Sequence, residues 1–231
     1  MLAVRLLHKD KNLIIVEKPV GMPSQSDPSG DVDAMTDASR LLRDAGERDE
    51  LWLVHRLDRT VGGLIAFARN KRSTAELSKI VAEGKMEKLY FAVCHGIPED
   101  GEYRDLLFKD AATAKAYVVK TARKGAKEAR LTVKKLAADA DNAALISVAL
   151  DTGRFHQIRA QLSARSHPLI GDKKYGSRDG ARRTPALYAY MLSFRLFGKQ
   201  IKVSATPCIE EYPWNLFDTE IYKAASGDNA K

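Results

Sequence analysis

The stretch Val54-His55-Arg56-Leu57-Asp58-Arg59-Thr60-Val61-Gly62-Gly63-Leu64-Ile65-Ala66-Phe67-Ala68 places a polar turn between two apolar strings. The strings 51–54 and 64–68 are short and rich in large apolar residues, which is typical of buried strands. Gly62 and Gly63 close the polar segment that separates them. We therefore expect two strands joined by a turn that carries several charged side chains.

The same alternation of short apolar strings and turn residues continues on both sides of this stretch. Further strands are predicted over residues 13–17, 88–93, 116–119, 129–133 and 145–150, and a final hairpin over 186–197 and 200–204. Helical periodicity predicts helices over 34–45, 71–82 and 156–165. Strands 116–119 and 129–133 are expected to be neighbours across a basic turn at 123–127. The sum is an α+β fold, with a large mixed, mostly antiparallel sheet flanked by helices.

The composition restricts the class of protein. Of the 231 residues, 45% are hydrophobic and 29% are charged, which is typical of a globular chain. No apolar run approaches the roughly 20 residues that span a bilayer, and the N-terminus does not resemble a signal peptide. Cys94 and Cys208 are too few for a disulfide framework or a cysteine-rich zinc site. A reduced, cytoplasmic location is the expectation.

The charge is unevenly distributed along the chain. The net charge is +8 and the isoelectric point is near 9.4. Residues 23–52 carry eight acidic and three basic side chains, whereas residues 111–135 carry eight basic and one acidic, and residues 152–185 carry eight basic and two acidic. A single lysine is most simply explained by solubility. Two clustered basic stretches favour a surface that binds the phosphates of a nucleic acid.

Several common kinds of site are missing from the sequence. It contains no glycine-rich loop ending in Gly-Lys-Ser or Gly-Lys-Thr, and no strand-borne Gly-x-Gly-x-x-Gly. The five histidines show no His-x-x-x-His pairing, there is no Cys-x-x-Cys, and Gly-x-Ser-x-Gly is absent. The sequence therefore predicts no metal and no nucleotide cofactor.

Two polar turns remain as candidates for chemistry, and each follows an apolar string. The first holds Asp58, and the second runs from Leu150 to Arg159. Neighbouring arginines favour an ionised Asp58, which suits a nucleophile. Arg159 has the reach to pair with that carboxylate through its planar fork. The alternative is that Asp58 is a turn or cap residue held by Arg59.

Tyr90 lies in the alternating string Lys88-Leu89-Tyr90-Phe91-Ala92-Val93. A strand tyrosine is usually a core aromatic whose hydroxyl is hydrogen-bonded. It is also a residue type that stacks on unpaired RNA bases. The pattern alone leaves both interpretations open.

Five stretches match a known set of motifs in the same order along the chain. They are Val16–Met22 for N-K-P-x-G-L, Val54–Ala68 for H-R-L-D-x-x-T-S-G-L, Lys88–Val93 for K-x-Y-x-A-x-V, Thr152–Gly176 for T-G-R-T-H-Q-I-R-x-H-L followed by H-P-x-x-G-D-x-x-Y-G, and Ala186–Phe194 for L-H-A-x-x-L-x-F. The chain thus resembles the RluA-type pseudouridine synthases, which isomerise uridine in ribosomal and transfer RNA. The departures are Val61, Phe155, Gln161 and Tyr188.

The resemblance implies a role for each candidate residue. Asp58 would be the nucleophile, attacking either the uracil ring or the anomeric carbon, while Tyr90 would stack on the uracil and assist proton removal. Arg159 would orient Asp58, and Arg56 would fill the space left by the extracted nucleotide. The residues expected to bind the RNA are Arg56, His55, Arg154, His156, Lys124, Lys127, Lys173 and Lys174.

The resemblance also implies the organisation of the chain and its partners. We expect a single pseudouridine synthase catalytic domain over residues 1–223, without the additional N-terminal RNA-binding module of some relatives, and a flexible tail over 224–231. The expected partner is structured RNA, and the expected state is a monomer that does not bind a membrane. A non-catalytic RNA-binding protein and a metal-dependent nuclease are the rival hypotheses.

Overall fold

The computed structural model describes residues 2–227, and these form two compact units. The first unit contains the described residues up to Glu87 together with Ala189–Pro207. The second contains Lys88–Tyr188 and the described residues from Cys208 onward. The single catalytic domain expected over residues 1–223 stays a prediction.

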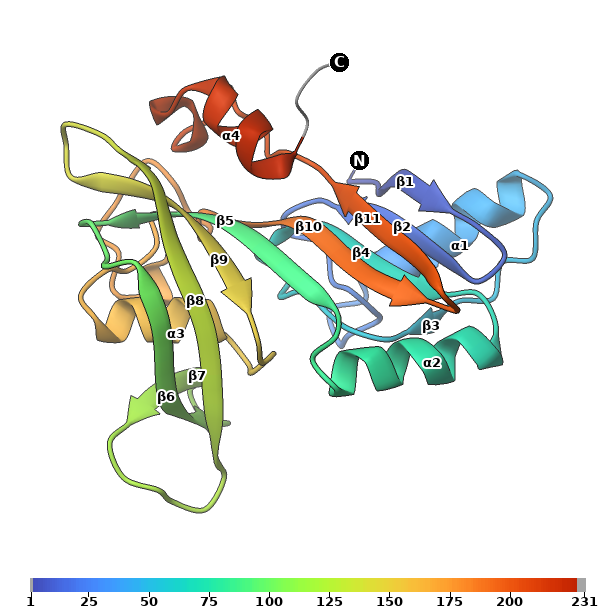
Figure 1. The fold of residues 1–231 in the computed structure, drawn as a ribbon, viewed down its shortest axis with the longest axis horizontal. Helices are drawn as coiled ribbons and strands as arrows, with labels where there is room; N and C mark the ends of the chain where they lie inside the picture. The colour runs from blue at the N-terminus through green and yellow to red at the C-terminus, as the bar shows by residue number, and fades with distance from the viewer. Residues whose placement is uncertain (1, 228–231) are drawn as a thin grey trace. The chain divides into compact units, whose positions relative to one another are not determined.

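The predicted fold class is confirmed. The described residues contain eleven strands, in a large and mostly antiparallel sheet, and four α-helices (Figure 1). Most of the predicted elements are present within a few residues of their expected bounds. The elements that were not predicted from the sequence are β1 (Arg5–Lys9), β6 (Gly101–Asp110) and α4 (Thr219–Ser226).

The first unit is built on a four-strand order, β1-β2-β4-β10, in which β3 also pairs with β4 and β11 with β10. Two helices belong to it, and α2 packs against β4. The elements are β1 (Arg5–Lys9), β2 (Leu13–Lys18), α1 (Ala34–Asp44), β3 (Trp52–Leu53), β4 (Gly62–Ala68), α2 (Lys71–Ala82), β10 (Leu187–Leu196) and β11 (Lys199–Ser204).

The centre of this unit is the antiparallel pair of β2 and β4. Ile14 pairs with Phe67 and Val16 with Ile65, and all seven residues of β4 are buried. Strands covered on both faces read as continuous apolar runs, which explains why both were recognised from sequence. Gly63 lies where β4 begins, with a φ of +111°, and a Cβ there would stand 2.3 Å from the carbonyl oxygen of Ala189. Glycine is therefore required at this close approach of two strands.

The helices of this unit begin where side-chain caps are available. Asp33 accepts hydrogen bonds from the backbone amides of Met35 and Thr36 at the start of α1. Asn70 accepts one from the amide of Ser73 at the start of α2. Capping of this kind satisfies amides that have no partner within the helix, which fixes the first residue of each helix.

The second unit has the strand order β5-β9-β8-β6-β7. Helix α3 packs against β6 and β7. The elements are β5 (Glu87–His95), β6 (Gly101–Asp110), β7 (Lys115–Val119), β8 (Ala126–Ala138), β9 (Ala143–Leu150), α3 (Gln157–Ala164), the short 3-10 helices η1 (Lys173–Tyr175) and η2 (Trp214–Leu216), and α4 (Thr219–Ser226).

One predicted pairing is wrong. The strands expected over 116–119 and 129–133 are not neighbours, because β6 lies between β7 and β8. Phe108 of β6 pairs with Tyr117 on one side and with Ala126 on the other. β6 was not recognised because charged residues interrupt its apolar positions, as in Gly101–Asp110.

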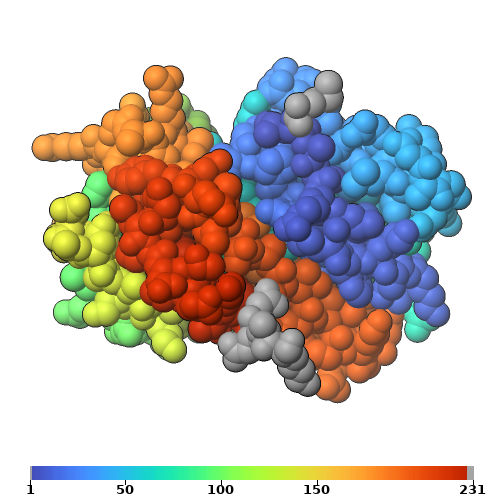
Figure 2. Space-filling view, turned by 90° about the horizontal axis from the view of Figure 1, so that it is seen from above, coloured from blue at the N-terminus to red at the C-terminus, as the bar shows by residue number. Residues whose placement is uncertain are grey.

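Helix α4 continues through Ser226, so residues 224–226 of the segment predicted as a tail are helical. The buried Ser226 hydroxyl donates to the carbonyl oxygen of Tyr222. The Tyr222 hydroxyl in turn donates to the carbonyl oxygen of Trp214 at 2.8 Å. Nearby, the Arg182 guanidinium donates to the carbonyl oxygen of Tyr212 at 2.7 Å. Figure 2 shows this C-terminal segment, in red, beside the light-orange loop that follows α3. Residues 228–231 lie outside the described part of the chain.

Candidate active site

The turn that carries Asp58 is fixed by buried hydrogen bonds from the loop that follows β2. The Ser24 hydroxyl donates to the carbonyl oxygen of Leu57 at 2.8 Å and accepts from the Leu57 amide at 3.0 Å. The carbonyl oxygen of Asp58 accepts from the amide of Val61 at 3.0 Å, which closes the turn. Leu57 is buried and Asp58 is half-buried. The backbone on both sides of the carboxylate is thereby held.

Lys18, the last residue of β2, ties this turn to the preceding loop. Its side chain is fully buried, and its Nζ lies 3.0 Å from the carbonyl oxygen of Pro19, 2.8 Å from that of Met22 and 3.4 Å from that of Arg59. An ammonium group has three donors, so these three carbonyl oxygens satisfy it. Lys18 therefore connects residues 19–22 to the residue that follows Asp58.

The surroundings of Lys18 shift its titration. Burial lowers its pKa from 10.5 to about 7, the charge of Asp58 acts in the opposite direction, and the charge of Arg59 lowers it further. No role was expected for Lys18 from the sequence. The feature that could have indicated one is its position directly before Pro19, at the end of an apolar string.

Arg59 binds the loop of residues 21–31. Its Nε donates to the carbonyl oxygen of Gly21 at 2.9 Å, its Nη1 donates to the Ser29 hydroxyl at 3.0 Å, and its Nη2 pairs with Asp31. The Gly21 amide donates back to the carbonyl oxygen of Arg59 at 2.8 Å. The guanidinium is thus engaged by the acidic loop, and the interpretation in which Arg59 holds the Asp58 carboxylate gains no support.

His55 and Arg56 precede Asp58 in the same turn. The Nε2 of His55 accepts a hydrogen bond from the backbone amide of Ala66 in β4, at 3.0 Å. This bond fixes the ring against the sheet. Arg56 is exposed. The two residues were expected to bind RNA, and that assignment stays a prediction.

In the second unit, Arg159 of α3 forms a buried ion pair that was not anticipated. Its Nε and Nη2 donate to the two carboxylate oxygens of Asp172, at 2.6 and 2.8 Å. Arg159 is 4% exposed and Asp172 is 1% exposed. The guanidinium also lies 4.9 Å from the ring centroid of Tyr175. A two-pronged pair of this kind fixes the plane of the guanidinium. The sequence feature that could have indicated Asp172 as the partner is the pair Gly171-Asp172, within the motif that ends at Gly176.

Tyr90 occupies β5, opposite Val148 of β9, and its side chain is 6% exposed. His156 precedes α3 with a left-handed φ of 52°, and its Nδ1 lies 3.0 Å from the Tyr175 hydroxyl. Both residues are thus held within the second unit. Their proposed contacts with a substrate stay predictions.

The remaining residues expected to bind RNA all lie in the second unit and are exposed. Lys124 lies in the turn before β8, Lys127 is in β8, and Lys173 and Lys174 are in η1. Arg154 precedes α3, and its Nε donates to the carbonyl oxygen of Glu128 at 2.8 Å. These five basic side chains are therefore available to solvent.

Two further observations concern the described residues as a group. Between residues 2 and 227, no three histidine, cysteine, aspartate or glutamate side chains are grouped so that they could hold a metal ion. No helix in that part of the chain is long and apolar enough to cross a bilayer.

Comparison with known proteins identifies the family. The family model described as RNA pseudouridylate synthase matches residues 12–164. The chain belongs to this family. The match contains Asp58, Tyr90 and Arg159, and the resemblance to RluA-type pseudouridine synthases is confirmed.

Relatives in sequence and in structure agree with this family. The chain is 30% identical over 207 residues to a ribosomal large subunit pseudouridine synthase C of Rickettsia felis, covering 87% of this chain and 66% of that protein. It is 30% identical over 210 residues to an uncharacterized RNA pseudouridine synthase of Zymomonas mobilis, covering 89% and 94%. The chain thus spans about two thirds of the Rickettsia protein and nearly all of the Zymomonas one.

Among solved structures, the fold is similar to that of human RNA pseudouridylate synthase domain containing 1. The TM-score is 0.76, the identity is 17%, and the match covers 99% of this chain and 96% of that one. Human RNA pseudouridylate synthase domain containing 4 matches with a TM-score of 0.74 at 21% identity, over 89% of each chain. At these identities the likeness concerns the fold alone.

The lowered pKa of Lys18 predicts a specific dependence of stability on pH. Between about pH 7 and the pKa of about 10.4 for an unperturbed lysine, the unfolded chain binds more protons at this position than the folded chain. The free energy of unfolding should therefore rise with pH in this window. Lys18→Met should remove this part of the rise, measured by urea unfolding at pH 7 and pH 9.5. The exposed Lys11→Met is the control; equal pH dependence in the wild type and Lys18→Met would contradict the expectation.

The buried pair predicts a large effect of Asp172→Asn. Removing one charge of a buried ion pair leaves the other uncompensated, at a cost of about 3–5 kcal/mol. Urea unfolding should show this loss of stability. Glu220→Gln breaks the exposed ion pair with Lys223 and serves as control, with no measurable change expected. A stability of Asp172→Asn equal to that of the control would show that Arg159 does not depend on Asp172.

Proposed function

We propose that this chain is an RNA pseudouridine synthase that isomerises a specific uridine of structured RNA to pseudouridine, with Asp58 as the nucleophile. The observation that carries the proposal is the match of residues 12–164 to the RNA pseudouridylate synthase family. The geometry of the Asp58 turn supports it. A carboxylate on a backbone held by buried hydrogen bonds is pre-organised for attack.

The reaction exchanges one glycosidic bond for another. The bond between N1 of uracil and C1′ of the ribose breaks, the base rotates, and a bond forms between C5 and C1′. The hydrogen on C5 leaves as a proton and N1 takes up a proton, so the reaction is an isomerisation and no oxidant or reductant is required. Asp58 would attack either the ring or C1′, and departs when the new carbon–carbon bond has formed. The proposal requires no cofactor and no metal.

Tyr90 and Arg159 would serve this carboxylate and its substrate. Tyr90 would stack on the uracil and assist removal of the C5 proton. Arg159 would pair with Asp58 and orient it. The two bonds from Nε and Nη2 to Asp172 support this role, because they hold the guanidinium plane in one orientation.

The target nucleotide must leave its stack to be isomerised, at a cost of a few kcal/mol. Arg56, exposed two residues before Asp58, would stack in the gap and offset part of that cost. The other RNA contacts would come from His55, Arg154, His156, Lys124, Lys127, Lys173 and Lys174. We infer that the enzyme acts in the cytoplasm as a monomer.

The proposal also concerns the class of RNA on which the enzyme acts. The name of the Rickettsia relative refers to the large ribosomal subunit, which favours ribosomal RNA over transfer RNA as the substrate. Such RNA is recognised through shape and unpaired nucleotides. The cationic stretches of the chain suit that mode of binding.

The proposal predicts that Asp58→Ala abolishes isomerisation. The variant should form no pseudouridine when incubated with total RNA from cells that lack the gene, because the nucleophile is missing. Chemical mapping of pseudouridine in that RNA measures the product. Asp44→Ala, at the exposed end of α1, is the matched control and should act like the wild type. Undiminished product with Asp58→Ala would remove Asp58 from the mechanism, and no product with the wild type would reject the proposed function.

A further inference from the structure

A pocket in the second unit follows from the register of β7, β6 and β8. Lys109 of β6 is opposite Ala116 of β7, and Leu107 of β6 is opposite Lys127 of β8. Residues directly opposite in neighbouring strands project from the same face, and so do residues two apart in one strand. These four side chains therefore share one face of the sheet.

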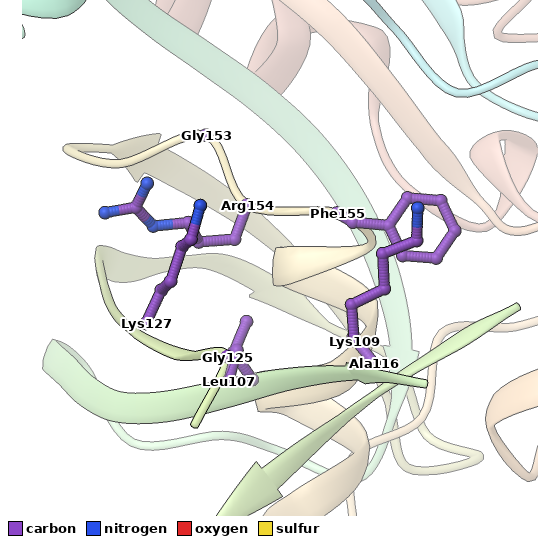
Figure 3. Close-up of a pocket in the computed structure, with 8 residues that line it drawn as sticks. All are labelled: Leu107, Lys109, Ala116, Gly125, Lys127, Gly153, Arg154 and Phe155. Carbon is purple, nitrogen blue, oxygen red and sulfur yellow. The ribbon is translucent and has the colours of Figure 1, made fainter. Parts of the chain in front are cut away.

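That face is also the one on which α3 packs. Leu107, Ala116 and Ala129 form an apolar cluster with Ala160 of α3 and with Tyr175. Beyond this cluster the face continues to Lys109 and Lys127, where the segment 153–155 before α3 lies over it. The result is a pocket of about 220 Å³. Its lining is Leu107, Lys109, Ala116, Gly125, Lys127, Gly153, Arg154 and Phe155 (Figure 3).

The charged residues that line this pocket are all cationic. They come from three separate segments, namely Lys109 from β6, Lys127 from β8 and Arg154 from the segment before α3. None of the three forms an ion pair with a carboxylate of residues 2–227, although many other basic side chains in that part of the chain do. The pocket therefore concentrates positive charge without an internal counter-ion.

Two of these cations are held by neighbouring groups. The Nε of Arg154 donates to the carbonyl oxygen of Glu128 at 2.8 Å, which anchors the guanidinium beside β8. The Nζ of Lys109 lies 4.7 Å from the ring centroid of Phe155, which itself stacks on His156 at 3.8 Å. In Figure 3, Lys127 and Arg154 lie toward one end of the pocket and Lys109 and Phe155 toward the other. The cations thus surround a common space.

Edge protection does not explain this arrangement. Lysines on an edge strand discourage pairing with other chains, and β7 is the last strand of the order, but Lys109 lies in β6 and Lys127 in β8. That purpose does not account for an arginine anchored over the same face from another segment. Like charges gathered at one pocket repel one another, and an anion that enters relieves this repulsion. The arrangement fits an anion site better than a solvated edge.

We propose that this pocket binds one backbone phosphate of the RNA, outside the target uridine. The proposal rests on the proposed function for the nature of the ligand, and it adds a second point at which the RNA is held. The planar fork of Arg154 matches the oxygens of a phosphate, and Lys109 and Lys127 supply further charge. Gly125 and Gly153 have no side chains to obstruct an approaching backbone. Of the basic turn at 123–127, Gly125 and Lys127 line the pocket, whereas Lys124 does not.

The test is the salt dependence of binding to a single-stranded RNA, fluorescein-labelled dodecauridylate, which does not require the natural substrate. Each phosphate contact to a single strand contributes about 0.7 to the slope of log affinity against log salt. The full chain with Lys109→Gln and Lys127→Gln should show a slope smaller by about that amount. Lys109→Arg with Lys127→Arg should keep the wild-type slope, because the charge is retained.

The matched control is Lys199→Gln with Lys202→Gln, two exposed lysines of β11 that bear the same loss of charge. A clearly smaller effect of the control pair supports the pocket. Equal effects of the two pairs would overturn it, because the lysines would then act only through net charge. If the pocket pair fails to fold, Arg154→Gln, at an exposed residue, is compared with Lys199→Gln alone, which bears the same loss of one charge. Binding is measured without catalysis, so the two proposals can fail separately. If the wild type forms no pseudouridine but the salt dependence of its binding differs from that of the variants as expected, the isomerase function is rejected and the phosphate pocket is not.

Discussion

The three bonds from Lys18 to the carbonyl oxygens of Pro19, Met22 and Arg59 are the constraint on which the candidate site depends. They join the end of β2 to the residue after Asp58, while Ser24 fixes the residue before it. The two segments are far apart in sequence, and their backbone polar groups would be costly to bury without partners. A buried lysine at the end of a central strand supplies those partners. The position of the Asp58 carboxylate within the first unit follows from this arrangement.

The second unit uses the same principle of fixing a functional group through a buried partner. Asp172 orients Arg159, and the Glu128 carbonyl oxygen anchors Arg154 beside the cationic pocket. In both cases an arginine is held in a fixed geometry. Fixed guanidinium groups lose less freedom when they bind an anion, so they bind it more tightly. The proposed enzyme would thus hold its nucleophile and its RNA with groups that are ordered before the substrate arrives.

Much of the fold could be predicted because local signals were strong. Helix 71–82 was predicted with its observed bounds from its apolar periodicity, and the structure shows that Asn70 caps its first turn. β6 was missed because its charged residues hide the alternation, and the wrong pairing of β7 with β8 followed from that. Asp58, Tyr90 and Arg159 were predicted as site residues from the order of the motifs. Lys18, Asp172 and the pocket were not, because each depends on contacts between segments that only the strand register and the loop path bring together.

The central claim is that this chain exchanges the glycosidic bond of uridine through Asp58. It is tested most directly by incubating the purified chain with total RNA that carries tritium at C5 of uridine, taken from cells that lack the gene. Formation of the bond between C5 and C1′ displaces that hydrogen, so the wild type should release tritium in equal amount to the pseudouridine formed. Asp58→Asn should release none. Release by Asp58→Asn at the wild-type rate, or none by the wild type, would contradict the claim.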